Sequence, residues 1–149
     1  MTKINIYTIN KISSSSPENK IILDYLKRLP WKIAFHELEI KGKFPPEKQK
    51  LLEGEMLLKS IPSNSFIIAL DERGKSLNSA EFANIFEKVT QPIAFVIGGA
   101  YGLSDDIKSS AGLLLSLSDM TMPHMLARVM LVEQLYRAYT INIGHPYHK

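Results

Sequence analysis

Short, uninterrupted apolar segments that alternate with helical patterns constrain the fold of this 149-residue chain more than any other feature. Residues 66–70 (FIIAL) and 93–97 (IAFVI) are apolar at every position. Continuous apolar runs of this length are typical of parallel strands that helices cover on both faces. The two segments therefore predict the buried centre of a parallel sheet.

The remaining elements are predicted from hydrophobic periodicity. Residues 3–8 and 31–35 alternate in strand fashion, and residues 113–117 form a further apolar run. Between these strands, helical spacing predicts helices over residues 17–29, 51–61, 78–86, 104–110 and 123–139. Because strands and helices alternate, we expect one domain over residues 1–149, an α/β three-layer sandwich around a five-stranded, mainly parallel sheet.

Three expectations concern the ends of these elements. The pair Asn78 and Glu81 predicts a capping box at the start of a helix. The polar segment 71–75 is expected to end the strand 66–70, and Thr121 is a candidate cap for the last helix.

Composition excludes several classes of protein. The chain has no cysteine, so it has neither disulfides nor thiolate metal sites. Its N-terminus lacks the pattern of a secretory signal and no stretch approaches the roughly 20 apolar residues of a membrane span, so we expect a cytosolic protein without membrane contact. The net charge of +3 suits a polyanionic partner without requiring one.

Three predicted strand ends carry features of a ligand site, at Leu70, Gly98 and Leu117. Ligands of parallel α/β sheets bind at the carboxyl ends of the strands. Residues 98–102 (GGAYG) match neither a dinucleotide nor a triphosphate fingerprint, and a tight turn explains these glycines as well as a ligand does. Residues 116–124 form an irregular polar loop whose backbone faces either a ligand or only the following helix.

The last helix is apolar on nearly all sides, which predicts a subunit interface, most simply that of a symmetric dimer. Its Arg128 and Arg137 then need partners, either a phosphate or Glu133. The terminal residues 144–149 (GHPYHK) hold two histidines without nearby carboxylates or thiols, so no metal site is expected. This tail is either disordered or a cluster that stacks on and orients a base.

Five segments together resemble the ribosomal RNA large subunit methyltransferase H family, which belongs to the SPOUT class. They are residues 69–75 (ALDERGK), 95–103 (FVIGGAYGL), 115–124 (LSLSDMTMPH), 133–138 (EQLYRA) and 146–149 (PYHK). The resemblance covers the full length and is dense from Phe66 onward. Asn78 departs from it, since many members have serine there.

This resemblance implies a trefoil knot in the C-terminal half and a homodimer with sites at its interface. It implies methylation by S-adenosylmethionine of ring nitrogen 3 of a pseudouridine, in large-subunit ribosomal RNA of the assembled ribosome. The cofactor contacts that it implies are Leu70, Gly98, Leu117, Ser118, Asp119, Met120, Thr121 and Met122.

Catalytic roles are expected for three residues. His148 is the candidate base or proton acceptor, Tyr147 a stacking or hydrogen-bonding partner, and Arg128 a cation near the base or a phosphate. Tyr147 and His148 are expected to cover the cofactor pocket. Two other functions stay open, namely methylation of another RNA or a protein, and a nonenzymatic ribosome-binding factor.

Overall fold

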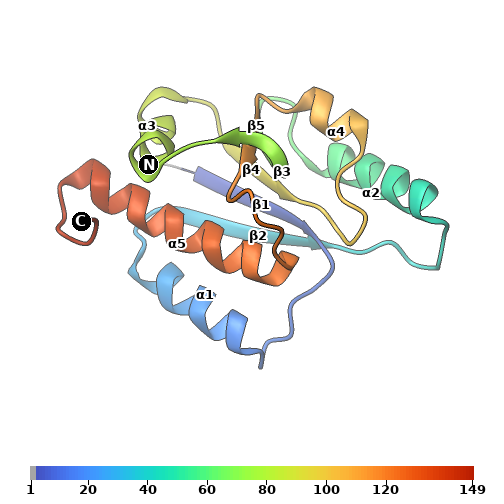
Figure 1. Ribbon diagram of the computed structural model, residues 1–149, viewed down its shortest axis with the longest axis horizontal. Coiled ribbons are helices and arrows are strands. Elements are labelled where there is room, and N and C mark those ends of the chain that lie inside the picture. Colours follow the sequence, from blue (N-terminus) through green and yellow to red (C-terminus); the bar gives the residue numbers. More distant parts are fainter. Residues whose placement is uncertain (1–2) are drawn as a thin grey trace.

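A computed structural model describes residues 3–149 as a five-stranded sheet between two layers of helices (Figure 1). The strands are β1 (Lys3–Ile9), β2 (Lys32–Leu38), β3 (Phe66–Ser76), β4 (Ile93–Ile97) and β5 (Leu113–Ser116). Their order is β2-β1-β4-β3-β5, and every neighbouring pair is parallel. The predicted five-stranded parallel sheet is confirmed, with the two fully apolar segments as β3 and β4.

The helices divide between the two faces of the sheet. They are α1 (Pro17–Arg28), α2 (Pro46–Ser60), α3 (Ser79–Lys88), α4 (Asp105–Ser110) and α5 (His124–Ile143). One core cluster joins the sheet to α1, α3 and α5, and a second joins it to α2 and α4. The three-layer arrangement is therefore confirmed, whereas the trefoil knot stays a prediction from the family resemblance.

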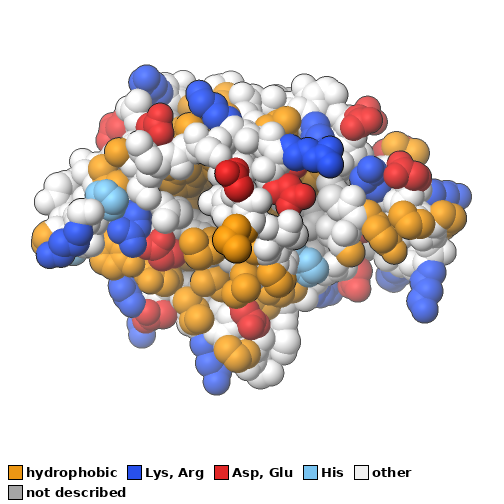
Figure 2. Space-filling model, in the orientation of Figure 1, with side chains coloured by type: hydrophobic (Ala, Val, Ile, Leu, Met, Phe, Trp, Pro, Cys, Tyr) orange, Lys and Arg blue, Asp and Glu red, His pale blue; other side chains and the backbone are white. Residues whose placement is uncertain are grey.

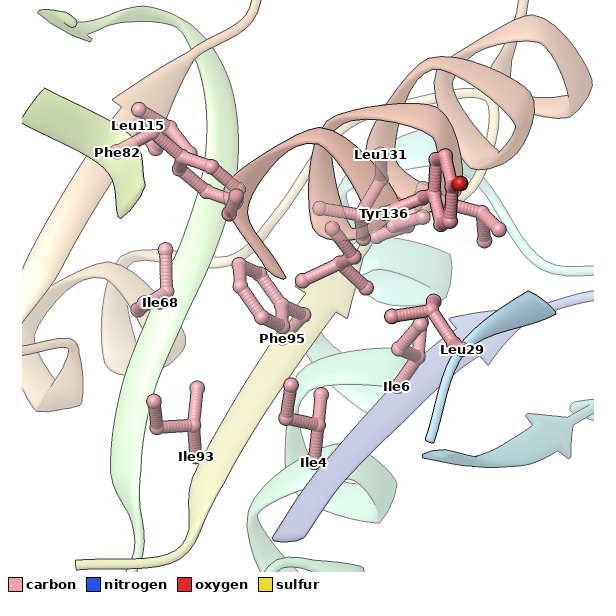
Figure 3. Close-up of a cluster of buried hydrophobic side chains, with 14 of the residues drawn as sticks. Ile4, Ile6, Leu29, Ile68, Phe82, Ile93, Phe95, Leu115, Leu131 and Tyr136 are labelled. Carbon is pink, nitrogen blue, oxygen red and sulfur yellow. The ribbon is translucent and has the colours of Figure 1, made fainter. Parts of the chain in front are cut away.

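Helix α5 closes the larger core cluster (Figure 3). Ile4, Ile6 and Phe95 extend from β1 and β4 toward Leu131 and Tyr136 of α5. The first three of these side chains and Leu131 are fully buried. Burying a large apolar side chain contributes about 1.5–3 kcal/mol, so α5 is an essential part of the core.

Local signals set the helix boundaries. The Asn78 side chain accepts a hydrogen bond from the Glu81 backbone N–H, and the Glu81 side chain accepts one from the Asn78 N–H, so the predicted capping box is confirmed. Ser104 caps α4 in the same manner through the Ile107 N–H. Helix α5 ends at Gly144, whose φ of 73° suits glycine because it lacks a Cβ.

Two predictions about element ends are wrong. Strand β3 does not end before the polar segment 71–75 but continues to Ser76, with a shift in register between Leu70 and Lys75. Strand pairing uses backbone groups, so polar side chains do not prevent it. Thr121 does not cap α5, because its hydroxyl donates to Glu72 at 2.8 Å instead.

The surface of α5 retains apolar side chains. Leu126, Met130 and Ile143 are each more than two-fifths exposed. In Figure 2 apolar side chains gather over α5 and the neighbouring part of α1. Among residues 3–149, no helix is both long and apolar enough to cross a membrane.

Candidate active site

A cavity of about 530 Å³ lies where β4 and β5 end, beside the middle of β3. Its lining comes from three separate parts of the chain: Leu70, Asp71 and Glu72; residues 97–103; and Leu115, Leu117, Ser118, residues 120–124 and Ala127, with Lys50 and Lys108 at its edge. The volume lies within the range of about 300–1,000 Å³ of small-molecule sites. The three positions singled out from the sequence, Leu70, Gly98 and Leu117, therefore meet in one cavity, although Leu70 lies within β3 and not at its end.

Glycines form the wall contributed by residues 98–102. Gly102 has a φ of 82°, and its N–H donates to the Gly99 carbonyl at 3.1 Å, which closes a tight turn. A Cβ on Gly98 would lie 3.0 Å from the Gly102 carbonyl carbon and 2.9 Å from Leu103. The segment is thus both a tight turn and a cavity wall, so the two interpretations of the sequence do not exclude each other.

The loop over residues 117–122 forms the opposite wall and is held by its own side chains. The Ser116 hydroxyl donates to the Ser118 carbonyl at 2.9 Å, and the Ser118 hydroxyl accepts from the Met120 N–H at 3.0 Å. Of the eight residues expected to bind the cofactor, seven line the cavity. Asp119 is exposed and lies outside its lining.

Asp71 is the most buried carboxylate of the cavity lining, and it is paired. Its carboxylate lies 3.2 Å from the Lys108 ammonium and accepts a hydrogen bond from the Arg73 N–H at 3.1 Å. Burial alone would raise the pKa of Asp71, but this hydrogen bond and the Lys108 charge outweigh burial and lower it below the ordinary value. Asp71 is therefore an anion in the cavity lining, and the Lys108 ammonium balances its charge.

We expect Lys108→Met to raise the pKa of Asp71, because burial remains while the cation is lost. In the wild type the folded pKa lies below the unfolded value, so the carboxylate stabilises the fold above the unfolded pKa and this contribution is lost as pH falls through the folded pKa. In the variant the folded pKa moves toward the unfolded value, so this pH-dependent contribution should be smaller. NMR titration of the Asp71 carboxyl carbon measures this, with Lys50→Met as the control, since Lys50 pairs with Glu47. Equal Asp71 pKa values in all three proteins would contradict the prediction.

Several cavity residues were missed by the sequence analysis. Lys50 and Lys108 reach the cavity from α2 and α4, and Tyr101 and His124 line its rim. Tyr101 and His124 lie in the segments 98–102 and 116–124, which were already candidates for the ligand site. Their place in these segments was the available signal. No sequence pattern marked the two lysines as cavity residues, because they resemble the other solvent-exposed lysines of amphipathic helices.

The C-terminal tail folds back along α5 and contacts the middle of this helix at Glu133. Tyr147 donates its hydroxyl hydrogen to Glu133 at 3.2 Å and lies 3.2 Å from the Tyr25 hydroxyl. Arg137 binds the same Glu133 carboxylate at 2.6 Å and donates to His148 Nδ1 at 3.1 Å. Burial, the Tyr25 hydrogen bond and the Glu133 charge raise the pKa of Tyr147, so its hydroxyl keeps its proton.

Arg128 has its partners inside its own chain. The side chain is 1% exposed, and its guanidinium binds the Glu37 carboxylate at 2.6 Å and the Asn10 carbonyl. The expected partners were Glu133 or a phosphate, but Glu133 binds Arg137 instead. In the single chain the Arg128 guanidinium is therefore buried and not accessible to a base or a phosphate.

Tyr147 and His148 do not cover the cavity of their own chain. The cavity lies at the start of α5, beside His124 and Ala127, while the tail follows its end at Ile143 (Figure 1). The contacts of Tyr147 and His148 on α5 are Glu133 and Arg137, which follow the last cavity residue of this helix, Ala127. In the single chain Tyr147 and His148 therefore lie outside the cavity lining.

A family model described as "Predicted SPOUT methyltransferase" matches residues 2–148 of the chain. The chain belongs to the SPOUT methyltransferase family. Among curated relatives, a ribosomal RNA large subunit methyltransferase H from Rhodospirillum centenum is 42% identical over 89% of this chain and 90% of its own length. One from Clostridium botulinum (strain Kyoto / Type A2) is 42% identical over 98% of this chain and 99% of its own. The resemblance found in the sequence is confirmed.

The fold of this SPOUT methyltransferase also occurs in a solved structure. The SpoU methyltransferase AviRb from Streptomyces viridochromogenes, in complex with AdoMet, aligns with a TM-score of 0.51 over 96% of this chain at 14% identity. The chain spans 59% of the length of AviRb. At this identity the likeness supports the α/β fold alone.

Proposed function

We propose that this SPOUT methyltransferase transfers a methyl group from S-adenosylmethionine to a base of large-subunit ribosomal RNA. The observation that carries the proposal is the cavity at the ends of β4 and β5, beside the middle of β3, in a chain that matches ribosomal RNA large subunit methyltransferase H relatives over most of its length. Following the family resemblance, we assign ring nitrogen 3 of a pseudouridine as the acceptor.

The cavity residues fit S-adenosylmethionine. The absent Cβ of Gly98 lets the glycine turn close tightly against Gly102 and Leu103, and this compact turn forms one wall of the cavity. Leu115, Leu117 and Met122 supply apolar surface, and the loop over residues 117–122 supplies backbone polar groups. When bound, the cofactor supplies the activated methyl group.

We further propose a homodimer in which each tail covers the cavity of the other subunit. The exposed apolar side chains of α5 support this arrangement, because a second copy would remove them from water. The position of the tail supports it as well, because Tyr147 and His148 contact Glu133 and Arg137 and do not line the cavity of their own chain.

The hydrogen bond between Arg137 and His148 refines the role of His148. A guanidinium only donates, so Nδ1 of His148 accepts, and a neutral imidazole then carries its hydrogen on Nε2. In this arrangement His148 donates a hydrogen bond to the base and stabilises the negative charge that develops when ring nitrogen 3 loses its proton. A role as proton acceptor requires His148 to leave Arg137.

Methyl transfer to isolated substrates tests the proposal. We expect incorporation of labelled methyl into whole ribosomes, with less into stripped ribosomal RNA and none into transfer RNA. The modest charge of +3 provides few phosphate contacts, so an assembled particle must supply much of the docking surface. No incorporation and no calorimetric binding of S-adenosylmethionine would favour a nonenzymatic factor, and preferential labelling of transfer RNA would change the substrate.

A further inference from the structure

Glu53 of α2 is a buried carboxylate that the proposed reaction does not use. It is 6% exposed, and the Gln49 side chain donates to its Oε2 at 2.9 Å. Its Oε1 has no hydrogen-bond partner among residues 3–149, and no lysine, arginine or histidine there forms an ion pair with it. A buried polar atom without a partner destabilises the fold, so its retention needs an explanation.

The carboxylate lies directly behind the glycine wall of the cavity. A Cβ built on Gly99 would lie 3.2 Å from Glu53 Oε1 and 3.3 Å from Oε2, closer than most real Cβ contacts. The next residue, Gly54, packs so tightly that its Cβ would lie 2.1 Å from the Ser104 hydroxyl. These two glycines bring α2 against the segment 98–104, so that one residue, Gly99, separates Glu53 from the cavity.

The other charges near the cavity are balanced or in contact with water. Asp71 is paired with Lys108, and Lys50 with Glu47. Glu72 is exposed, and water screens its charge. A negative charge on Glu53 is neither paired nor exposed, so its field extends through the thin wall with little screening.

We propose that Glu53 determines the charge preference of the cavity, which makes the cavity bind the cationic cofactor S-adenosylmethionine more tightly than its product S-adenosylhomocysteine. This inference rests on the proposed function. The two molecules differ by one methyl group and by the positive charge of the sulfonium. A buried anion behind the wall attracts only the charged form, and it thereby assists exchange of product for fresh cofactor.

Calorimetry with three ligands tests this preference. The third ligand, sinefungin, carries an amine in place of the sulfonium methyl and is also cationic. We expect Glu53→Gln to weaken binding of S-adenosylmethionine and sinefungin by about tenfold, and that of S-adenosylhomocysteine by less than about twofold. Glu55→Gln is the matched control, since this carboxylate of the same helix is exposed and forms no ion pair among residues 3–149, so all three affinities should stay unchanged.

The pattern of losses separates charge preference from a structural role. Equal weakening of all three ligands, or no change in any, would overturn the inference while leaving the proposed function intact. Wild-type protein that binds none of them would overturn both. If Glu53→Gln does not fold, Gln49→Lys provides a second test of the inference. This variant places an ammonium beside the same carboxylate at a half-buried position. We expect the same selective loss in that variant, and wild-type affinity ratios would contradict the inference.

Discussion

Replacement of His148 by alanine is expected to slow methyl transfer to ribosomes by about 10²- to 10⁴-fold, the usual contribution of a positioned proton-transfer or hydrogen-bonding group. Binding of S-adenosylmethionine should change little, because His148 contacts Arg137 at the end of α5 and does not line the cavity of its own chain. Single-turnover methylation of ribosomes measures the rate, and calorimetry measures the affinity.

His145→Ala is the matched control for this variant. His145 lies in the same tail, and its ring accepts a hydrogen bond from the Tyr147 N–H at 3.2 Å, without contact to Glu133 or Arg137. We expect its rate to stay close to that of the wild type. An unchanged rate for His148→Ala, with cofactor bound, would remove His148 from the reaction.

His148→Gln distinguishes the two roles of this side chain. Glutamine retains an N–H donor but does not accept a proton near neutral pH. If His148 donates a hydrogen bond to the base, the glutamine variant should keep much more activity than the alanine variant. Equal activity of the two variants would instead favour the role of proton acceptor.

A mixing experiment tests whether the tail acts on the other subunit. Gly98→Val should distort the glycine wall of the cavity and abolish cofactor binding, since a Cβ alone already meets Gly102. Refolding this variant together with His148→Ala yields heterodimers in which one of two sites is complete. We expect recovery of about a quarter of wild-type activity, because half of the dimers are mixed and each has one intact site. No recovery would contradict the shared site.

Replacement of Arg128 by alanine is expected to lower the free energy of unfolding by about 3–5 kcal/mol, the cost typical of breaking a buried ion pair. The change leaves Glu37 without its cation and the Asn10 carbonyl without its donor, and it opens space under α5. Glu37 also accepts the Ile12 N–H at 2.7 Å, so the loop after β1 should loosen as well.

Urea unfolding measures this loss. Arg28→Ala is the control, because Arg28 forms its ion pair with Asp24 on the surface, where such pairs contribute little. We expect no measurable change for it. Arg128→Ala with wild-type stability would show that the buried pair is not a major part of the fold.

The sequence predicted the sheet well because its two central strands are apolar on both faces. Residues 66–70 and 93–97 admit few alternatives, and they became β3 and β4. The capping box at Asn78 was equally clear, because its signal lies within four residues. Strong local patterns were therefore sufficient for the order and type of the elements.

Long-range pairings could not be predicted in the same way. Arg128 and Glu37 are 91 residues apart, and nothing in either local sequence indicates the other. The continuation of β3 past Leu70 depends on backbone bonds to β5, which side-chain polarity does not report. In the sequence Glu53 looks like any other charged residue of a helix. Only the close approach of Gly99 in the fold distinguishes it from the other glutamates of α2.

The position of α5 between α1 and α3 limits when the protein can fold during synthesis. Both of these helices contact α5, which follows them in the chain and leaves the ribosome after them. Until then, apolar side chains of α1, α3 and the sheet lack their cover, as Ile22, Phe82 and Phe95 illustrate. A nascent chain that stalls before residue 124 should therefore be prone to aggregation and sensitive to proteases, and it should depend on chaperones until α5 has emerged.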